Sequence, residues 1–351
     1  MSWQSSLPPL YQKWSEDFLE NPLPSESKTT CDDCIMCKPS PGTIQFNAVT
    51  KCCTYLPEIP NFLAGGILSD DSEESAWGRD TFEKRIQAQA GVTPLGVGPT
   101  SEFSAVYGQN GFGFGQAEGL ACPHLHTESG QCGIWKYRES TCCTWFCKYE
   151  RGALSNKFWT WLYKTLKQTE QDLSIWCAGQ LDIGSYGMRY LLHSNTHETQ
   201  THSRDMADLP TLKAIWGEWW DRKEEFYKKS YELVHALTWD DVVGITGPQA
   251  HANTKLMNTY LDEVHFSSHP KHLWAGKFEI AHQGKDRSFL RTSNQYDPIE
   301  IDNEILNVLG HFDGRETAVV IDEIRKNKSI EISHETLRSL SDFNILTSTE
   351  T

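Results

Sequence analysis

The cysteines of this chain are concentrated in one part of it. Ten of the eleven lie between Cys31 and Cys147, and only Cys177 lies outside. Cys31, Cys34 and Cys37 stand at two-residue spacing, which lets three thiolates turn toward one centre and hold a soft metal ion. The other members of this group are Cys52, Cys53, Cys122, Cys132, Cys142, Cys143 and Cys147. The spacing predicts a metal site.

Length and charge exclude several classes of protein. With 351 residues the chain can bury a large core and does not need a metal merely to fold. Its net charge is -15, which disfavours nucleic-acid binding because that binding requires neutralisation of phosphates. The amino terminus lacks a secretory signal, and no apolar run reaches the ~18 residues of a membrane span. We therefore predict a cytoplasmic protein with reduced thiols, no membrane contact and no nucleic-acid partner.

The periodicity of apolar residues predicts an α+β fold that is mainly α. Residues 1–30 form an amino-terminal extension. Residues 31–150 form a cysteine-cluster metal-binding domain with a long, Gly-rich insertion at 54–121. Residues 151–275 form a helical region, and residues 276–351 a small α+β, winged-helix-like module.

Helical spacing predicts an amphipathic segment at Leu10–Leu19, a helix from Leu154 onward, and one long helix over Trp216–Leu237 with core aromatics. Thr238 precedes Trp239 as the start of another helix. The insertion 54–121 is weakly periodic, which favours a functional loop or one packed on the metal region.

The last 75 residues alternate between short strands and short helices. We expect strands at Lys277–His282, Ser288–Thr292, Ile299–Ile301 and Phe343–Leu346, a turn at Asp313–Gly314, and helices at Glu304–Phe312, Thr317–Ile324 and Ser333–Leu340.

The cysteines after residue 120 are too widely spaced for a single zinc finger. Cys122, Cys132, Cys142 and Cys147 lie ten, ten and five residues apart, so they converge only through folding. The triplet also lacks one ligand of a tetrahedral set, and either Cys52 or Cys53 supplies it. We therefore expect the two halves to close into one unit across the insertion.

Three segments resemble a bacterial cysteine-cluster family described as zinc- or iron-chelating and called YkgJ-like. The residues that carry the likeness are the triplet, Cys122-Pro123-His124-Leu125, Gly130-Gln131-Cys132-Gly133-Ile134-Trp135, and Arg138 with Cys142, Trp145 and Cys147. The likeness covers residues 31–150. Departures are Lys38 after the triplet, Trp135 for a tyrosine, Glu139 for a proline and Cys143 for an arginine.

The resemblance implies bound iron–sulfur or zinc. Its ligands would be Cys31, Cys34, Cys37, Cys53, Cys122, Cys132, Cys142 and Cys147, with Cys52 and Cys143 as further candidates. Eight thiolates suit either metal in number. A dry shell of Trp135, Trp145, Phe146 and Trp159 favours iron–sulfur. Arg138 would offset thiolate charge and bond to carbonyl groups or sulfur.

Two groups of histidines offer other ligands. His124 and His126 flank Cys122 and are alternative metal ligands or simple polar neighbours. His193, His197 and His202 lie near Glu198 and Asp205 in a polar segment typical of an exposed loop. An iron-dependent enzyme would require His193, His197 and Glu198 to converge. No G-x-S-x-G or H-E-x-x-H motif is present, so no catalytic residue is assigned.

The carboxyl-terminal segment is similar to winged-helix-like peptide-recognition modules that accompany peptide-modifying enzymes. Phe312-Asp313-Gly314-Arg315, Thr317 and the ending Leu337, Leu340, Phe343, Ile345 and Leu346 carry this likeness. Such modules bind a peptide as an added strand. The resemblance therefore implies a protein or peptide partner.

The sequence as a whole predicts a cytosolic metal-binding protein that serves redox chemistry, maturation or a metal-dependent modification. The alternative is a non-catalytic interaction module stapled by zinc. Whether the chain is an enzyme stays open at this stage.

Overall fold

The protein has an α+β fold that is mainly α, as the sequence predicts, with 54% helix and 11% strand. The computed structural model describes residues 7–28, 31, 33–109, 113–194, 208–292 and 294–349, without the side chains of 193 and 194. Within these residues the strands form four small antiparallel sheets and no large central one. Helix packing therefore supplies most of the core. No helix in this part of the chain is both long and apolar enough to cross a membrane.

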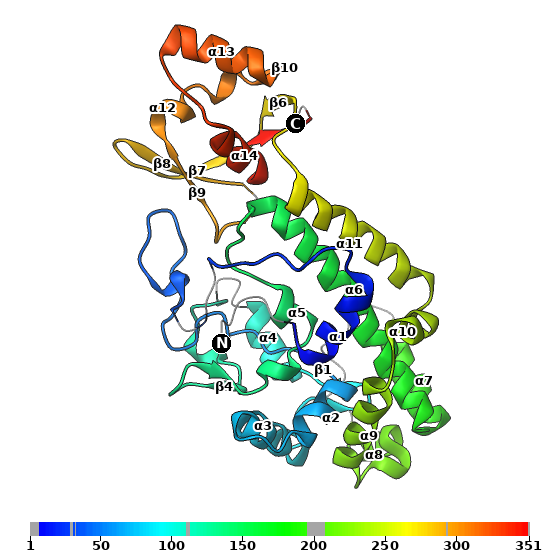
Figure 1. The fold of residues 1–351 in the computed structure, drawn as a ribbon. Coiled ribbons are helices and arrows are strands. Elements are labelled where there is room, and N and C mark those ends of the chain that lie inside the picture. The colour runs from blue at the N-terminus through cyan, green and yellow to red at the C-terminus, as the bar shows by residue number, and fades with distance from the viewer. Residues whose placement is uncertain are drawn as a thin grey trace.

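Buried apolar side chains fall into three clusters. The large one combines residues from Leu7 to Val264, and a second combines residues from Leu273 to Leu346. The third is small and contains four cysteines. In Figure 1 the second cluster corresponds to a separate lobe at one end of the long helices α6 and α11.

The helical body is organised by α6, whose buried residues Phe158, Leu162, Leu166 and Leu173 recur at helical spacing and which packs against α11, α10 and α9. Thr238 caps α10 in a reciprocal capping box with Asp241, as the sequence signal suggests. The helices of this body are α1 (Pro9–Phe18), α6 (Gly152–Gln180), α7 (Gly184–Ser194), α8 (Leu209–Trp216), α9 (Lys223–His235), α10 (Trp239–Thr246) and α11 (Pro248–Phe266).

The prediction of one long helix over Trp216–Leu237 is wrong in one respect, because the helix is interrupted after Trp216, where α8 ends. Gly217 adopts a left-handed φ of +53°, and a 3-10 turn at Gly217–Trp219 precedes α9. The Trp219 indole N–H then donates to Leu181 O at 2.7 Å. The aromatic residues Trp216, Phe226 and Tyr227 are buried, as expected for core.

The insertion 54–121 contains regular structure where the sequence suggested a loop. Its elements are β1 (Ile59–Pro60), α2 (Asn61–Ser69), α3 (Ala76–Gln87), β2 (Val92–Thr93), β3 (Gly96–Val97) and α4 (Ser101–Gln109). Every residue of α2 from Asn61 to Leu68 is buried, so the helix has no polar face and no periodic signal. Gly65 lets α2 approach α9, since a Cβ there would meet the Tyr227 carbonyl.

The cysteine region contributes β4 (Leu125–His126), β5 (Gln131–Cys132) and α5 (Ser140–Thr144). The carboxyl-terminal lobe contains β6 (His272–Ala275), β7 (Glu279–Gln283), β8 (Arg287–Arg291), β9 (Ile299–Asp302), α12 (Asn303–Leu306), β10 (Asp313–Glu316), α13 (Thr317–Lys328), α14 (His334–Asp342) and β11 (Leu346–Thr347). The sheets run β7-β8-β9 and β10-β6-β11.

Three details of the lobe differ from the sequence prediction. The predicted strand Phe343–Leu346 is wrong over its first three residues, which turn after α14, and strand β11 begins only at Leu346. Asp313–Gly314 begins strand β10 instead of forming a turn, because β10 pairs with β6. The predicted helix Glu304–Phe312 is split into α12 and a 3-10 turn at Leu309–His311. Ser333 caps α14 through the Thr336 N–H, as predicted.

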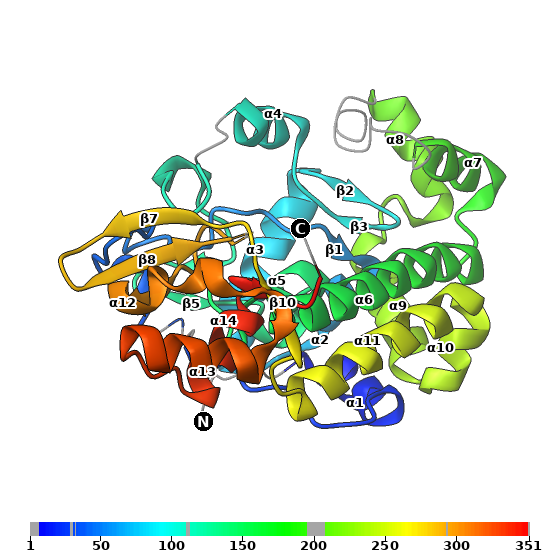
Figure 2. The ribbon, with the colours of Figure 1, turned by 90° about the horizontal axis from the view of Figure 1, so that it is seen from above.

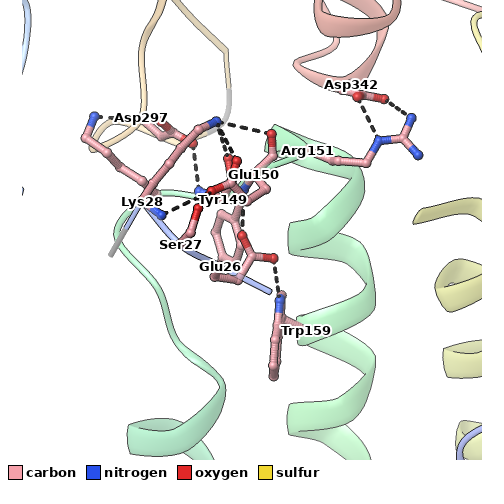
Figure 3. A network of polar contacts seen from close by, with 10 residues as sticks. Glu26, Ser27, Lys28, Tyr149, Glu150, Arg151, Trp159, Asp297 and Asp342 are labelled. Carbon is pink, nitrogen blue, oxygen red and sulfur yellow. Dashed lines mark hydrogen bonds and ion pairs between the residues drawn. The ribbon is translucent and has the colours of Figure 1, made fainter. Parts of the chain in front are cut away.

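Segment Lys148–Arg151 fastens the lobe to the body (Figure 3). The Arg151 guanidinium donates to both Asp342 oxygens at 2.9 and 2.7 Å and to Val264 O at 2.6 Å. The Tyr149 N–H donates to Asp297 Oδ2 at 3.0 Å, and Lys148 pairs with Asp297 at 3.7 Å. Figure 2 shows the β7–β8 hairpin on the same side of the molecule as the segment that follows Cys37. Gly42 of that segment packs on Ala281 of β7.

Glu26 binds the amino-terminal segment to Glu150 and Trp159, next to the contacts of Lys148–Arg151. Its carboxyl accepts from the Trp159 indole at 2.8 Å and from the Glu150 N–H at 2.5 Å. Only 1% of its surface is exposed, and this burial raises the pKa of Glu26 to about 7.

Glu26→Gln tests this assignment through pH. Between pH 4.5 and 7 the unfolded Glu26 ionises while the folded one holds its proton, so wild-type stability falls as pH rises. The fall is complete above pH 7 and amounts to about 3 kcal/mol at most. Urea unfolding from pH 4.5 to 8 should show wild type losing this amount relative to Glu26→Gln. The exposed Glu16→Gln is the control, and equal pH profiles for Glu26→Gln and wild type would contradict the assignment.

Candidate metal centre

Four cysteines from three separate segments pack together, and we name Cys34, Cys37, Cys52 and Cys147 the first thiol group. A 3-10 turn at Ile35–Cys37 brings the first two together, with the Cys37 N–H donating to Cys34 O at 3.0 Å. The cluster is closed by the buried side chains of Met36 and Phe46. Thiols that are more than 90 residues apart in sequence therefore share one apolar environment.

Aromatic rings surround the first thiol group. Phe114 lies edge-on to Trp145 at 5.0 Å between ring centroids and to Phe46 at 5.7 Å. Tyr296, from the carboxyl-terminal lobe, completes the shell at 5.5 Å from Phe46 and 5.9 Å from Trp145. These rings restrict the access of water to the sulfur atoms.

The predicted dry shell is only partly the one observed. Trp145 belongs to it. Phe146 and Trp159 instead pack against each other, with ring centroids 4.7 Å apart, and both belong to the large core. Trp135 lies under the Arg138 guanidinium at 3.4 Å. Sequence reasoning missed Phe46, Phe114 and Tyr296, and no local signal connects residues so far apart.

A second set of three cysteines comes from the segment just before β4, from β5 and from α5, and we name Cys122, Cys132 and Cys142 the second thiol group. Burial raises the pKa of Cys122 to about 12, and the Cys132 thiol adds to this rise. Burial and Glu139 raise the pKa of Cys142, and Cys122 and Cys132 contribute further. The three thiols therefore lie within electrostatic range of one another.

The two thiol groups are neighbours. Burial raises the pKa of Cys132 to about 11, and Cys31 and Cys52 add to it. Burial also raises the pKa of Cys147, with contributions from Cys52 and Cys34. The cysteines before residue 54 and those after residue 121 are therefore close to one another in the fold.

The remaining cysteines have different surroundings. Cys31 is exposed, and the Cys53 thiol hydrogen-bonds that of Cys52 while its carbonyl accepts from the Cys122 N–H at 2.8 Å. Cys143 packs in the large core and points its thiol at Ser140 O, 3.5 Å away. Cys177 is fully buried near Ser230 O, as expected for an apolar core residue.

Cations stand beside both thiol groups. Burial raises the pKa of Cys37 to about 11 and that of Cys147 as well, while Lys51 opposes the rise at Cys37 and Lys148 opposes it at Cys147. Arg138 opposes it at Cys132 and donates to Trp135 O at 3.1 Å and Cys142 O at 3.2 Å. The predicted carbonyl contacts of Arg138 are therefore present, and its guanidinium lies near the second thiol group.

Glu139 holds α5 in place, a role the sequence comparison noted only as a departure. It is fully buried, and its carboxylate accepts from the N–H groups of Thr141 at 2.7 Å and Cys142 at 2.9 Å. An acidic residue at a helix start is a recognisable capping signal. This cap fixes the backbone that carries Cys142.

His124 is buried between α3 and the β4–β5 hairpin. Burial, with a contribution from the Arg85 guanidinium, lowers the pKa of His124 to about 3, so the imidazole is neutral. His126 instead faces an open pocket of about 510 Å³ whose wall includes Trp77, Asp80 and Cys132. The second thiol group is thus reachable from the surface at Cys132.

Among the described residues, no three His, Cys, Asp or Glu side chains already stand in metal-binding geometry. The thiols form no disulfides; Cys122 and Cys147 are buried and the other members of the two groups are half-buried, so they pack as small apolar side chains. A metal binds such a set by displacing its protons. Soft sulfur donors fit zinc and iron–sulfur centres and do not suit magnesium or calcium.

The other predicted histidine site lies outside the described residues. His197, Glu198, His202 and Asp205 belong to the undescribed range 195–207, and the side chain of His193 is not described.

Comparison of the chain with protein-family models, curated proteins and solved structures gives no significant match.

Thiol alkylation of the metal-free, reduced protein at pH 8 tests these placements. Exposed Cys31 should react with iodoacetamide more than ~10-fold faster than Cys143 or Cys177, whose thiols are buried and whose pKa values burial raises. Peptide mapping by mass spectrometry gives the order of modification, and urea should equalise it. Early labelling of Cys177 in the folded protein would contradict the structure.

Proposed function

We propose that this chain is a cytosolic metal-binding protein that holds iron–sulfur or zinc through its two thiol groups. The observation that carries the proposal is the first thiol group itself. Four free thiols from three segments share one apolar cluster with aromatic walls. A chain of this length has no need to gather so many thiols for packing alone.

The surroundings fit a charged centre. Four thiolates around a divalent metal carry a net charge of about -2, which a dry site tolerates only beside cations. In a chain of net charge -15, Lys51 and Lys148 stand at the first thiol group and Arg138 at the second. The resemblance to the YkgJ-like family supports the same ligand class.

The proposed ligands differ in one residue from those the resemblance implies. Packing favours Cys52 over Cys53 beside Cys34, Cys37 and Cys147, because Cys52 belongs to the same apolar cluster as these three and Cys53 does not. When bound, iron–sulfur would supply electron transfer, and zinc would supply structural cross-linking. The rings of Phe46, Phe114, Trp145 and Tyr296 would exclude water from either.

Anaerobic purification decides between the two metals. Brown protein with broad visible absorption and acid-labile sulfide would support iron–sulfur, whereas colourless protein with stoichiometric zinc would support the zinc form. A folded preparation with neither metal, which also takes up none on reconstitution, would refute the proposal.

Cys52→Ser should remove about half of the bound metal, because one of two thiol groups loses a ligand. Cys177→Ser is the matched control, since that thiol is buried in the large core away from both groups and should leave the metal content unchanged. Metal content by elemental analysis and secondary structure by circular dichroism should be measured together. Equal metal content in the two variants would count against the first thiol group.

A second candidate is a zinc-stapled, non-catalytic interaction module. In the described residues β9 is an edge strand of the sheet β7-β8-β9, and α14 shares its core through Leu337 and Leu340. An extended peptide can add to such an edge. Because Asn294 also donates to Cys147 O at 3.3 Å, a zinc-filled first thiol group would brace this lobe. Stoichiometric zinc without acid-labile sulfide is its expected signature.

A further inference from the structure

We propose that His124 is a metal ligand, and that its Nε2 atom completes the second thiol group as a set of three thiolates and one imidazole. The inference rests on the proposed function. Three cysteines leave a tetrahedral metal one ligand short, and three Cys with one His is a common zinc set.

The position of His124 is fixed by its neighbours. Its backbone N–H donates to the Cys122 sulfur, and its carbonyl accepts from the Gly133 N–H at 2.8 Å. Its ring stacks on Phe82 at 4.9 Å, and none of its surface is exposed. The imidazole is therefore held rigidly beside a cysteine of the second thiol group.

Hydrogen bonding to Thr81 determines which ring nitrogen carries the proton. The Thr81 hydroxyl lies 2.7 Å from Gly78 O and 2.8 Å from His124 Nδ1. A hydroxyl has one hydrogen, so both contacts are hydrogen bonds only when Thr81 donates to Gly78 O and accepts from Nδ1–H. The other tautomer would keep one of the two bonds and leave a buried N–H without an acceptor.

Nε2 therefore carries a bare lone pair. This atom is buried and has no hydrogen-bond partner. Leaving a buried polar atom unpaired is unfavourable, and a bound metal ion would remove that cost. Histidine ligands commonly donate their other ring N–H to an orienting group, which is the role of Thr81 here.

The rival fourth ligands are less well placed. The Cys53 thiol is occupied with Cys52, and Cys31 is exposed. His126 bonds to Ser129 through Nδ1 at 2.9 Å and lies edge-on to Trp77 on the open pocket. Of these residues, only His124 combines burial with an unpaired donor atom.

Cobalt substitution separates the rivals. His124→Phe keeps the ring shape against Phe82, and His126→Phe and Cys53→Ser are matched controls. In a Cys52→Ser background, which disables the first thiol group, Co²⁺ should bind with visible d–d bands and sulfur-to-cobalt absorption of about three thiolates. His124→Phe should weaken Co²⁺ binding 10–100-fold and shift those bands, while both controls bind as the background does. If the background does not fold, the same comparison is made in the full chain by difference spectra.

Two further readouts distinguish a ligand from a merely unpaired histidine. In ¹⁵N-histidine spectra, Zn²⁺ should move the Nε2 resonance of His124 and leave Nδ1 protonated. Without metal, His124→Phe loses only the Nδ1–H bond to Thr81, so it should be at most slightly less stable than wild type, because no satisfied bond at Nε2 is lost. Unchanged Co²⁺ affinity and bands in His124→Phe, or loss of the site in Cys53→Ser, would overturn the inference. Failure of wild type to bind any metal would instead refute the proposed function.

Discussion

Cys147 packs in one apolar cluster with Cys34 and Cys52, and this contact joins the early cysteine segment to the segment that leads into the helical body. Neutral thiols can be buried at little cost, but thiolates in the same dry cluster are unstable without a metal or a cation. The aromatic walls therefore set two alternatives for the first thiol group: protonated sulfur or metal-bound sulfur. Because these rings exclude water, the charge of a bound metal centre would interact strongly with neighbouring charged groups.

This contact also connects the cysteine region to the carboxyl-terminal lobe. Asn294 donates to Cys147 O, Tyr296 joins the aromatic shell, and Asp297 binds the next two residues, Lys148 and Tyr149. The backbone around Cys147 is thus shared between a thiol site and the loop that leads into β9.

Elements with local signals could be predicted from the sequence. The stripe of α6, the capping box of α10 and the Ser333 cap of α14 depend on nearby residues. Elements defined by distant contacts could not: α2 is buried on all sides, and the helix over Trp216–Leu237 is interrupted at Gly217, where Trp219 bonds to the distant Leu181 O. In the site, cysteine spacing identified the region but not the placement of Cys52 over Cys53, which follows from folding across the insertion.

Charge is what distinguishes the two thiol groups from ordinary buried cysteines. Cys177 has an uncharged surrounding and only a carbonyl near its sulfur. The first and second thiol groups have Lys51, Lys148 and Arg138, and Arg138 is itself fixed by Trp135 and by the carbonyl of Cys142. The stacking and the carbonyl bond hold the guanidinium beside the second thiol group. A neutral imidazole as fourth ligand would lower the charge of a three-thiolate zinc centre there to about -1, opposite in sign to the neighbouring arginine.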